Sequence, residues 1–136
     1  MSEIERKVEE YRANLLRINE MKKGLIDAEI SFVSVKDTLN LNVYEWRKLF
    51  KGELPSKEKE VWELINNTPE HILKRDKAYK GFQKVLIDKG ITARQVSESL
   101  GIEINKVYRI LRKINVNRDR ELEKKVEQYL GVKVFE

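Results

Sequence analysis

The chain has 136 residues, of which 40% are hydrophobic and 38% are charged, and its formal net charge is +5. This length allows one ordinary domain or two very small ones. Because the chain contains no cysteine, disulfide bonds and cysteine-ligated metals are excluded. Its first residues are charged, and no apolar run approaches the roughly 18 residues that a membrane span needs. We therefore expect a cytoplasmic protein without a secretory signal and without contact to a membrane.

Positive charge is concentrated in the second half of the chain. Residues 1–68 hold 12 Lys and Arg against 13 Asp and Glu, a net charge of −1. Residues 69–136 hold 16 Lys and Arg against 10 Asp and Glu, a net charge of +6. This asymmetry favours a polyanion as the partner of the second half, although a solvated basic surface would give the same count.

A long helix is expected from about residue 3 to the mid-twenties. Its apolar residues alternate in steps of four and three, which is one stripe along a helix: Ile4, Val8, Tyr11, Leu15 and Ile18. The stripe spans fewer than three heptads, so packing on its own module is favoured over a coiled-coil seam. A homodimer through this helix stays open as the alternative.

Shorter helices follow in the first half. One is expected near residues 31–39, and a turn at residues 40–42 separates it from a second over residues 43–51. Ser56 has the side chain of an N-cap, which predicts a third helix over residues 57–65.

The run Asn66-Asn67-Thr68-Pro69 predicts a break between two modules. Thr68 can cap the next helix and Pro69 fits its first turn. Gly90, Gly101 and Gly131 then mark helix ends. The helices expected in the second half cover residues 70–89, 93–100, 104–113 and 119–130, followed by a short extended tail.

The two halves also resemble each other in sequence at a shift of 61 positions. The identical pairs are Leu25 and Leu86, Ile26 and Ile87, Asp27 and Asp88, Ile30 and Ile91, Val35 and Val96, Leu39 and Leu100, and Glu60 and Glu121. Most of these pairs are apolar and fall where a core is expected. We interpret them as a tandem duplication of one helical module, with the boundary near Thr68.

Residues 93–112 have the pattern of a helix-turn-helix, in which two helices cross steeply and the second presents its outer face to DNA. Gly101 stands at the turn, and the residues for the inner faces are Val96, Leu100, Ile102, Val107 and Ile110. The opposite face of the second helix holds one polar stripe with its flanks: Asn105, Arg109 and Arg112, flanked by Lys106, Tyr108 and Lys113. Arginine can read guanine, asparagine can read adenine, and lysine can hold phosphate.

The run Ile-Thr-Ala-Arg-Gln-Val-Ser-Glu-Ser-Leu-Gly-Ile over residues 91–102, followed by Val107 and Ile110, resembles the Cro-like, or XRE-type, helix-turn-helix family of phage and bacterial repressors. The resemblance covers residues 72–131. It implies that Thr92 and Arg94 touch phosphate. It also implies that certain residues face bases or backbone: Asn105, Tyr108, Arg109 and Arg112.

Two residues depart from the pattern of that family. Ser97 stands where the family usually has alanine, which is a small change. Ile104 stands where the family often has a polar residue that reads a base, and this puts the source of sequence specificity in doubt.

The first copy of the pattern is degenerate. Its possible DNA-binding residues are Tyr44, Lys48 and Lys51, which align with Asn105, Arg109 and Arg112. However, Asn40 replaces the turn glycine, Lys36 replaces the small residue at the helix crossing, and Glu45 adds a charge that phosphates repel. This copy either contacts DNA itself or is a scaffold that binds protein.

The sequence therefore predicts an all-α protein of two tandem helix-turn-helix bundles with a long N-terminal helix. Residues 1–67 form the first module, and residues 68–136 the basic module that binds double-stranded DNA. The function expected is that of a sequence-specific transcriptional regulator similar to phage or mobile-element repressors. The alternative is an adaptor that modulates another regulator or RNA polymerase.

Enzymatic and metal-binding functions find little support in the sequence. No motif for phosphate cradling, zinc binding or a nucleophile is present. His71 is the single histidine and makes a poor metal ligand by itself. Trp46 and Trp62 are expected in the core. We expect no catalytic residue, cofactor or metal.

Overall fold

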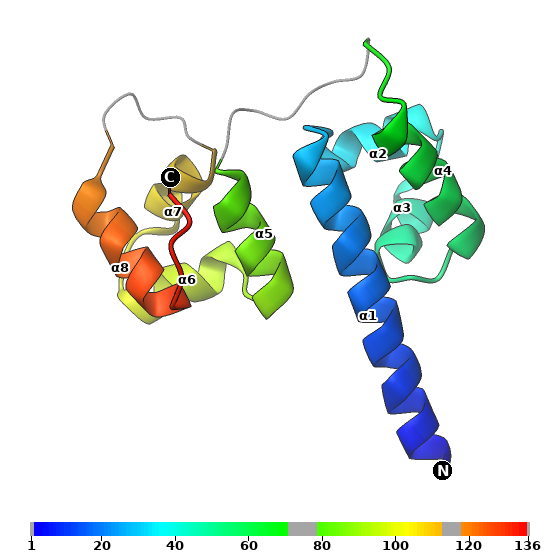
Figure 1. Ribbon diagram of the computed structural model, residues 1–136, viewed down its shortest axis with the longest axis horizontal. Coiled ribbons are helices and arrows are strands. Elements are labelled where there is room, and N and C mark those ends of the chain that lie inside the picture. Colours follow the sequence, from blue (N-terminus) through cyan, green and yellow to red (C-terminus); the bar gives the residue numbers. More distant parts are fainter. Residues whose placement is uncertain (1, 71–78, 113–117, 136) are drawn as a thin grey trace. The chain divides into compact units, whose positions relative to one another are not determined.

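The computed structural model describes residues 2–70, 79–112 and 118–135. Within these ranges the chain is all-helical and contains no β-strand (Figure 1). The expected all-α fold and the long N-terminal helix are therefore confirmed. In chain order the helices are α1 (Glu3–Asp27), α2 (Phe32–Thr38), α3 (Val43–Phe50), α4 (Pro55–Asn66), α5 (Lys80–Lys89), α6 (Ala93–Leu100), α7 (Ile104–Arg112) and α8 (Arg120–Leu130).

The chain divides into two compact units, Met1–Lys74 and Arg75–Glu136. The first unit contains α1 to α4 and the second contains α5 to α8. Each unit has its own hydrophobic core, and the two cores share no residue. His71 and Lys113 lie outside the described residues.

The core of the first unit forms where α1 crosses α4 and where α3 packs against both α2 and α4. Its fully buried members are Met21, Leu25, Ile30, Val35, Leu49 and Val61. Gly24 permits the crossing, because a Cβ atom there would lie 3.0 Å from the Trp62 ring. The Trp62 side chain covers this glycine but is still 37% exposed, so its expected core position is only partly right. Trp46 is half-buried and donates a hydrogen bond of 2.9 Å from Nε1 to the Phe32 carbonyl.

One ion pair closes the outer edge of the first core. Glu58 is buried, and its carboxylate accepts hydrogen bonds from Arg17 Nε at 2.6 Å and from Nη2 at 3.2 Å. Arg17 Nη2 also donates to the carbonyl of Gly52 at 3.2 Å. The hydrogen bond to Glu58 and the charge of its carboxylate raise the pKa of Arg17 above its ordinary value. A buried carboxylate needs such partners, so Arg17 ties α4 and the α3–α4 loop to α1.

The N-terminal half of α1 does not pack on its own unit. Ser2 caps the helix and accepts a hydrogen bond from the Glu5 amide. Of the five apolar residues in the predicted stripe, only Ile18 is buried. The other four are exposed: Ile4, Val8, Tyr11 and Leu15. The expectation that the whole stripe packs on its own module is therefore wrong, because α2, α3 and α4 cover only the C-terminal half of α1 (Figure 1).

Two residues predicted as helix caps have other places in the structure. α4 begins at Pro55 with Leu54 as its N-cap, so Ser56 is a residue of the first turn and not the cap. The hydroxyl of Thr68 donates to the carbonyls of Leu64 and Ile65, which places it at the end of α4. α5 begins at Lys80, and the earlier part of the helix predicted from Glu70 lies in residues 71–78, outside the described residues. Proline at the first helical position dictates the α4 start, since its missing N–H would be unpaired there in any case.

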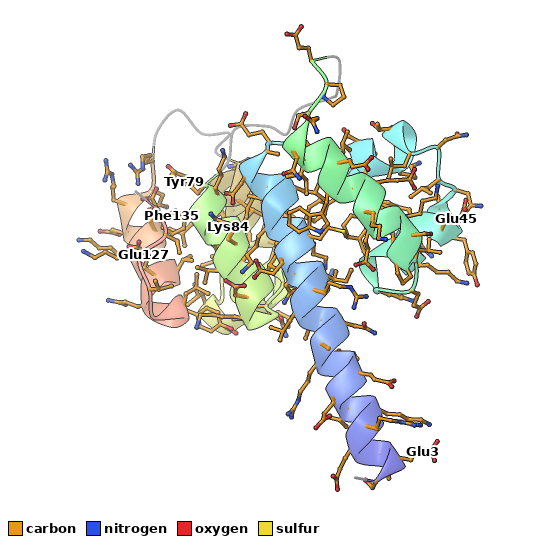
Figure 2. The ribbon with its side chains drawn as sticks, turned by 45° about the vertical axis from the view of Figure 1, so that its right-hand side comes forward. Glu3, Glu45, Tyr79, Lys84, Glu127 and Phe135 are labelled. Carbon is orange, nitrogen blue, oxygen red and sulfur yellow. The ribbon has the colours of Figure 1, made fainter. Side chains whose placement is uncertain are left out.

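The second unit closes on its own C-terminal tail. Phe82, Val96, Val107 and Val126 are fully buried in its core. Phe135 joins them at 2% exposure, and its ring lies 5.1 Å from that of Phe82 and 5.2 Å from that of Tyr79. Figure 2 shows Tyr79 and Phe135 close together on this unit. The tail, expected as a short extended segment, is thus part of the core.

The turns of the two units have the same geometry 61 positions apart. Glu29 (φ 62°) and Gly90 (φ 65°) end α1 and α5 in the left-handed region, and Asn40 (φ 55°) and Gly101 (φ 64°) do so after α2 and α6. Ile30 N donates to Leu25 O at 2.9 Å, just as Ile91 N donates to Leu86 O at 3.0 Å. Leu41 N donates to Lys36 O at 2.9 Å, just as Ile102 N donates to Ser97 O at 3.1 Å.

Burial follows the same alignment with some differences. Val35 and Val96 are both fully buried, and Leu49 and Ile110 are buried at the corresponding place in α3 and α7. Leu39 and Leu100, which were expected in the cores, are both half-buried at the edges of those cores. The shift of 61 therefore relates backbone turns and core positions as well as residue identities.

Candidate nucleic-acid interface

α6 and α7 are neighbours joined by a tight turn. α6 begins with a capping box, in which Thr92 Oγ1 accepts from the Gln95 amide at 3.2 Å and Gln95 Oε1 accepts from the Thr92 amide at 2.8 Å. Gly101 ends α6 in the left-handed region. The hydroxyl of Ser97 donates to the carbonyl of Ile102 at 2.5 Å. Both ends of α6 are thus fixed by local bonds.

α7 has one buried and one exposed face. Val107 is fully buried and Ile110 is 8% exposed, while Ile104 and Leu111 are half-buried. The exposed side chains are those of Asn105, Lys106, Tyr108 and Arg109. The structure therefore brings these four predicted residues together on one helix. Arg112 is the last residue of α7, but its side chain lies outside the described residues.

The α7 face has no acidic side chain of its own. Among the helices that the structure describes, α7 is the one whose sequence contains neither Asp nor Glu. Glu103 lies just before α7 and three residues ahead of Lys106, so the carboxylate of the preceding turn is near that lysine. Arg109 has no Asp or Glu three or four residues away along the helix. The half-buried Ile104 contributes to the inner side of the helix instead of to this polar face.

Thr92 and Arg94 are exposed at the start of α6. The Thr92 cap uses a lone pair of the hydroxyl oxygen, so the hydroxyl proton is left to donate to another acceptor. The first turn of a helix also attracts anions through its amide groups. This position suits a phosphate oxygen on chemical grounds.

The corresponding face of the first unit is differently built. Lys48 Nζ lies 4.6 Å from the centre of the Tyr44 ring, a cation–π contact. Glu45 completes a capping box with Asn42 at the start of α3, so its carboxylate serves the helix end (Figure 2). Lys51 is exposed just after α3.

Lys36 stands at the crossing of α2 and α3, where Ser97 stands in the second unit. Its side chain is 29% exposed and Nζ lies 3.8 Å from a carboxylate oxygen of Asp37. The charged end therefore leaves the crossing while the alkyl part stays inside it.

Some residues that hold this arrangement are not evident from the sequence. Arg118 Nη2 donates to Glu123 Oε1 at 2.6 Å and to the Phe135 carbonyl at 2.7 Å. Glu127 accepts from the Val134 amide at 2.7 Å (Figure 2). These bonds anchor the tail, and no local pattern announces them. Gln95 was detectable, because Thr-x-x-Gln before a helix is the signature of a capping box.

Two further findings bear on what the chain can do. Among the described helices, none combines the length and the apolar character that crossing a bilayer would need. In comparisons with known proteins, no family model, no curated protein and no solved structure matches this chain.

Proposed function

We propose that the chain is a sequence-specific DNA-binding transcriptional regulator built from two tandem helix-turn-helix modules. In this proposal α7 lies in the major groove and its exposed side chains contact bases and phosphates. Thr92 and Arg94 contact the DNA backbone beside it. A repressor of phage or mobile-element type is the specific form that the sequence resemblance favours.

The observation that carries the proposal is the exposed polar face of α7, a helix whose own residues include no Asp or Glu. Asn105 and Arg109 have the donor and acceptor groups that base edges require, and Lys106 supplies a point charge for phosphate. The net charge of +6 on residues 69–136 supports the same partner, since phosphate neutralisation supplies much of the affinity for DNA.

In this proposal the first unit adds phosphate contacts or acts as a scaffold. Tyr44, Lys48 and Lys51 would make those contacts. Lys48 is held against the Tyr44 ring, which leaves it available as a charge but not as a flexible base reader.

The test begins with selection of a preferred duplex from a random library, followed by anisotropy titrations. Arg109→Ala should cost roughly 1–3 kcal/mol of binding free energy and relax preference at one base position. Lys106→Ala should weaken binding to all duplexes and reduce the salt slope by about one. Both side chains are exposed, so circular dichroism and melting temperature should stay unchanged.

Lys48→Ala is the matched control, because it changes the aligned position of the first unit. If only Arg109→Ala weakens DNA binding, one unit reads DNA and the other is a scaffold. If Lys48→Ala weakens it as well, both units contact DNA. If a folded Arg109→Ala, Arg112→Ala double variant binds the selected duplex at full strength, the proposal fails.

A protein-interaction adaptor is the second candidate function. The exposed apolar residues of α1 favour it, because large apolar side chains gathered on a surface commonly mark a protein contact. It would replace the first proposal if no duplex were enriched over random sequence and the protein's weak binding to DNA lacked base preference.

A further inference from the structure

The N-terminal half of α1 presents four large apolar side chains that its own unit leaves uncovered. Ile4 is 76% exposed, Val8 43%, Tyr11 67% and Leu15 46%. We propose that this face pairs with the same face of a second copy of the chain, with the two α1 helices antiparallel. The inference does not rest on DNA binding, because the residues proposed for base reading belong to the other unit.

The spacing of these residues fits the seam of a two-helix coiled coil. In a heptad, Val8 and Leu15 occupy a positions, and Ile4 and Tyr11 occupy d positions. Antiparallel pairing sets each a residue against a d residue of the other helix. Ile4 then meets Leu15 of the second copy, and Val8 meets its Tyr11. A two-fold axis near residues 9 and 10 repeats both pairs, so all four side chains are covered in both copies.

Charge complementarity selects the antiparallel direction. Glu5 and Arg12 hold the e positions, which face each other across an antiparallel pair. Glu5 of each copy then faces Arg12 of the other, twice by symmetry. In a parallel pair the g residue Lys7 would face Arg12 of the other copy, twice with like charges. The flanking charges therefore attract each other in an antiparallel pair and repel each other in a parallel pair.

An open groove of about 580 Å³ extends the same face toward the body of the first unit. Apolar residues line it, among them Leu15, Ile18 and Phe50, together with charged residues of both signs: Lys7, Lys22, Lys51, Glu10 and Glu53. Antiparallel pairing brings the first turn of the second copy to this end of α1. That turn carries Glu5 and Glu3, of which Glu3 pairs within α1 with Arg6 and Lys7, and it lies at the far tip of the helix (Figure 2). The end of the second copy's helix therefore lies at the mouth of this groove, whose lining carries lysines and glutamates together.

The pairing is tested on the full chain by sedimentation equilibrium over a concentration series. The overlap of residues 4–15 is under two heptads, so a weak, concentration-dependent dimer is expected. Leu15→Glu should abolish it, because a charge would be buried in the seam. Leu16→Glu is the matched control: Leu16 is 67% exposed but lies off the stripe, so this variant should dimerise like the unchanged protein.

Charge reversal tests the direction. Arg12→Glu should raise the dissociation constant of the dimer roughly tenfold, since it sets two carboxylates against each other at two places. The double variant Glu5→Arg, Arg12→Glu should restore it. Stronger dimerisation of Arg12→Glu alone would indicate parallel helices and overturn the proposal.

Two further outcomes also overturn the proposal. If the chain stays monomeric at every concentration, the exposed face of α1 does not bind a second copy and is available to a different protein. A dimer that Leu15→Glu does not weaken uses another surface. DNA titrations of the same variants keep the two proposals separate, because Leu15→Glu can remove the dimer while a single chain still binds one half-site.

Discussion

Two non-glycine residues with positive φ occupy the helix ends where the second unit has glycine. Glu29 and Asn40 have φ of 62° and 55°, and Gly90 and Gly101 stand in the corresponding places. The left-handed region costs a residue with a Cβ atom about 1–2 kcal/mol, and asparagine less than most. Glu29 is therefore the residue with the most strained backbone among these four.

Exchanging residues at this turn should move stability in opposite directions in the two units. Glu29→Gly should raise the free energy of unfolding of the first unit by about 1 kcal/mol, since the strain is relieved. Gly90→Ala should lower that of the second unit by about 1 kcal/mol. The space around a Cβ at Gly90 is open to 4 Å, so the effect isolates the backbone. Urea denaturation measures the free energy of unfolding of each variant. A change of the same sign in both variants would refute the argument from backbone strain.

Lys22 gives the first unit a dependence on alkaline pH. Burial lowers the pKa of its ammonium group below the ordinary value of 10.5. The unfolded chain therefore binds this proton more strongly than the folded one between the lowered pKa and 10.5. The penalty of charged Lys22 is present in full below this window and disappears as pH rises through it. Lys22→Met should be more stable than the unchanged protein at pH 7, and thermal melts should show the difference shrinking toward pH 10.5.

At the scale of helices, the sequence prediction succeeded where a local signal decides the structure. Thr92 caps α6, and Gly90 and Gly101 end α5 and α6 as expected, because caps and left-handed residues act within one turn. Ser56 and Thr68 failed for a related reason. Each has a capping side chain, but Pro55 starts α4 two residues before the predicted start at Lys57, and Thr68 donates backward to the end of α4.

Other features needed tertiary information. The fate of the α1 stripe depends on what covers it, and periodicity alone cannot say whether a partner lies in the same chain. The sequence predicts only a short extended tail, and no local signal shows that the ring of Phe135 enters the core beside Phe82. For the candidate site, the exposed face of α7 followed from helical spacing, whereas the bond from Ser97 to Ile102 required the folded turn.

Phe135 should be as important to the second unit as a residue of its helices. Phe135→Ala removes a ring that is 2% exposed and contacts two other aromatic rings. It should cost about 3–5 kcal/mol of unfolding free energy, the usual range for a buried phenylalanine. Val132→Ala is the control in the same tail, because Val132 is 43% exposed. Chemical denaturation measures the free energy of unfolding of the second unit, and the transition of the first unit should stay unchanged. An equal loss of stability in Phe135→Ala and Val132→Ala would contradict the prediction.

At the scale of the whole molecule, the separate cores predict separate unfolding. Leu49→Ala should lower the stability of the first unit by about 2–5 kcal/mol, and Ile110→Ala that of the second by a similar amount. These residues occupy aligned positions in α3 and α7, and each belongs to a single core. Hydrogen exchange, read unit by unit, should show faster exchange only in the unit that carries the change. Exchange that accelerates in both units would show that they unfold together.

The shared turn geometry allows the exposed face of α7 to be transferred to α3. Because the two backbones have the same turn register 61 positions apart, the outer residues of α7 have defined destinations on α3. Asn105 and Arg109 map onto Tyr44 and Lys48, which are not members of the first core. An engineer could therefore write the outer face of one helix onto the other without redesigning a loop. If α7 reads DNA as proposed, a chain that carries the same outer face on α3 and α7 should prefer duplexes in which the site is repeated.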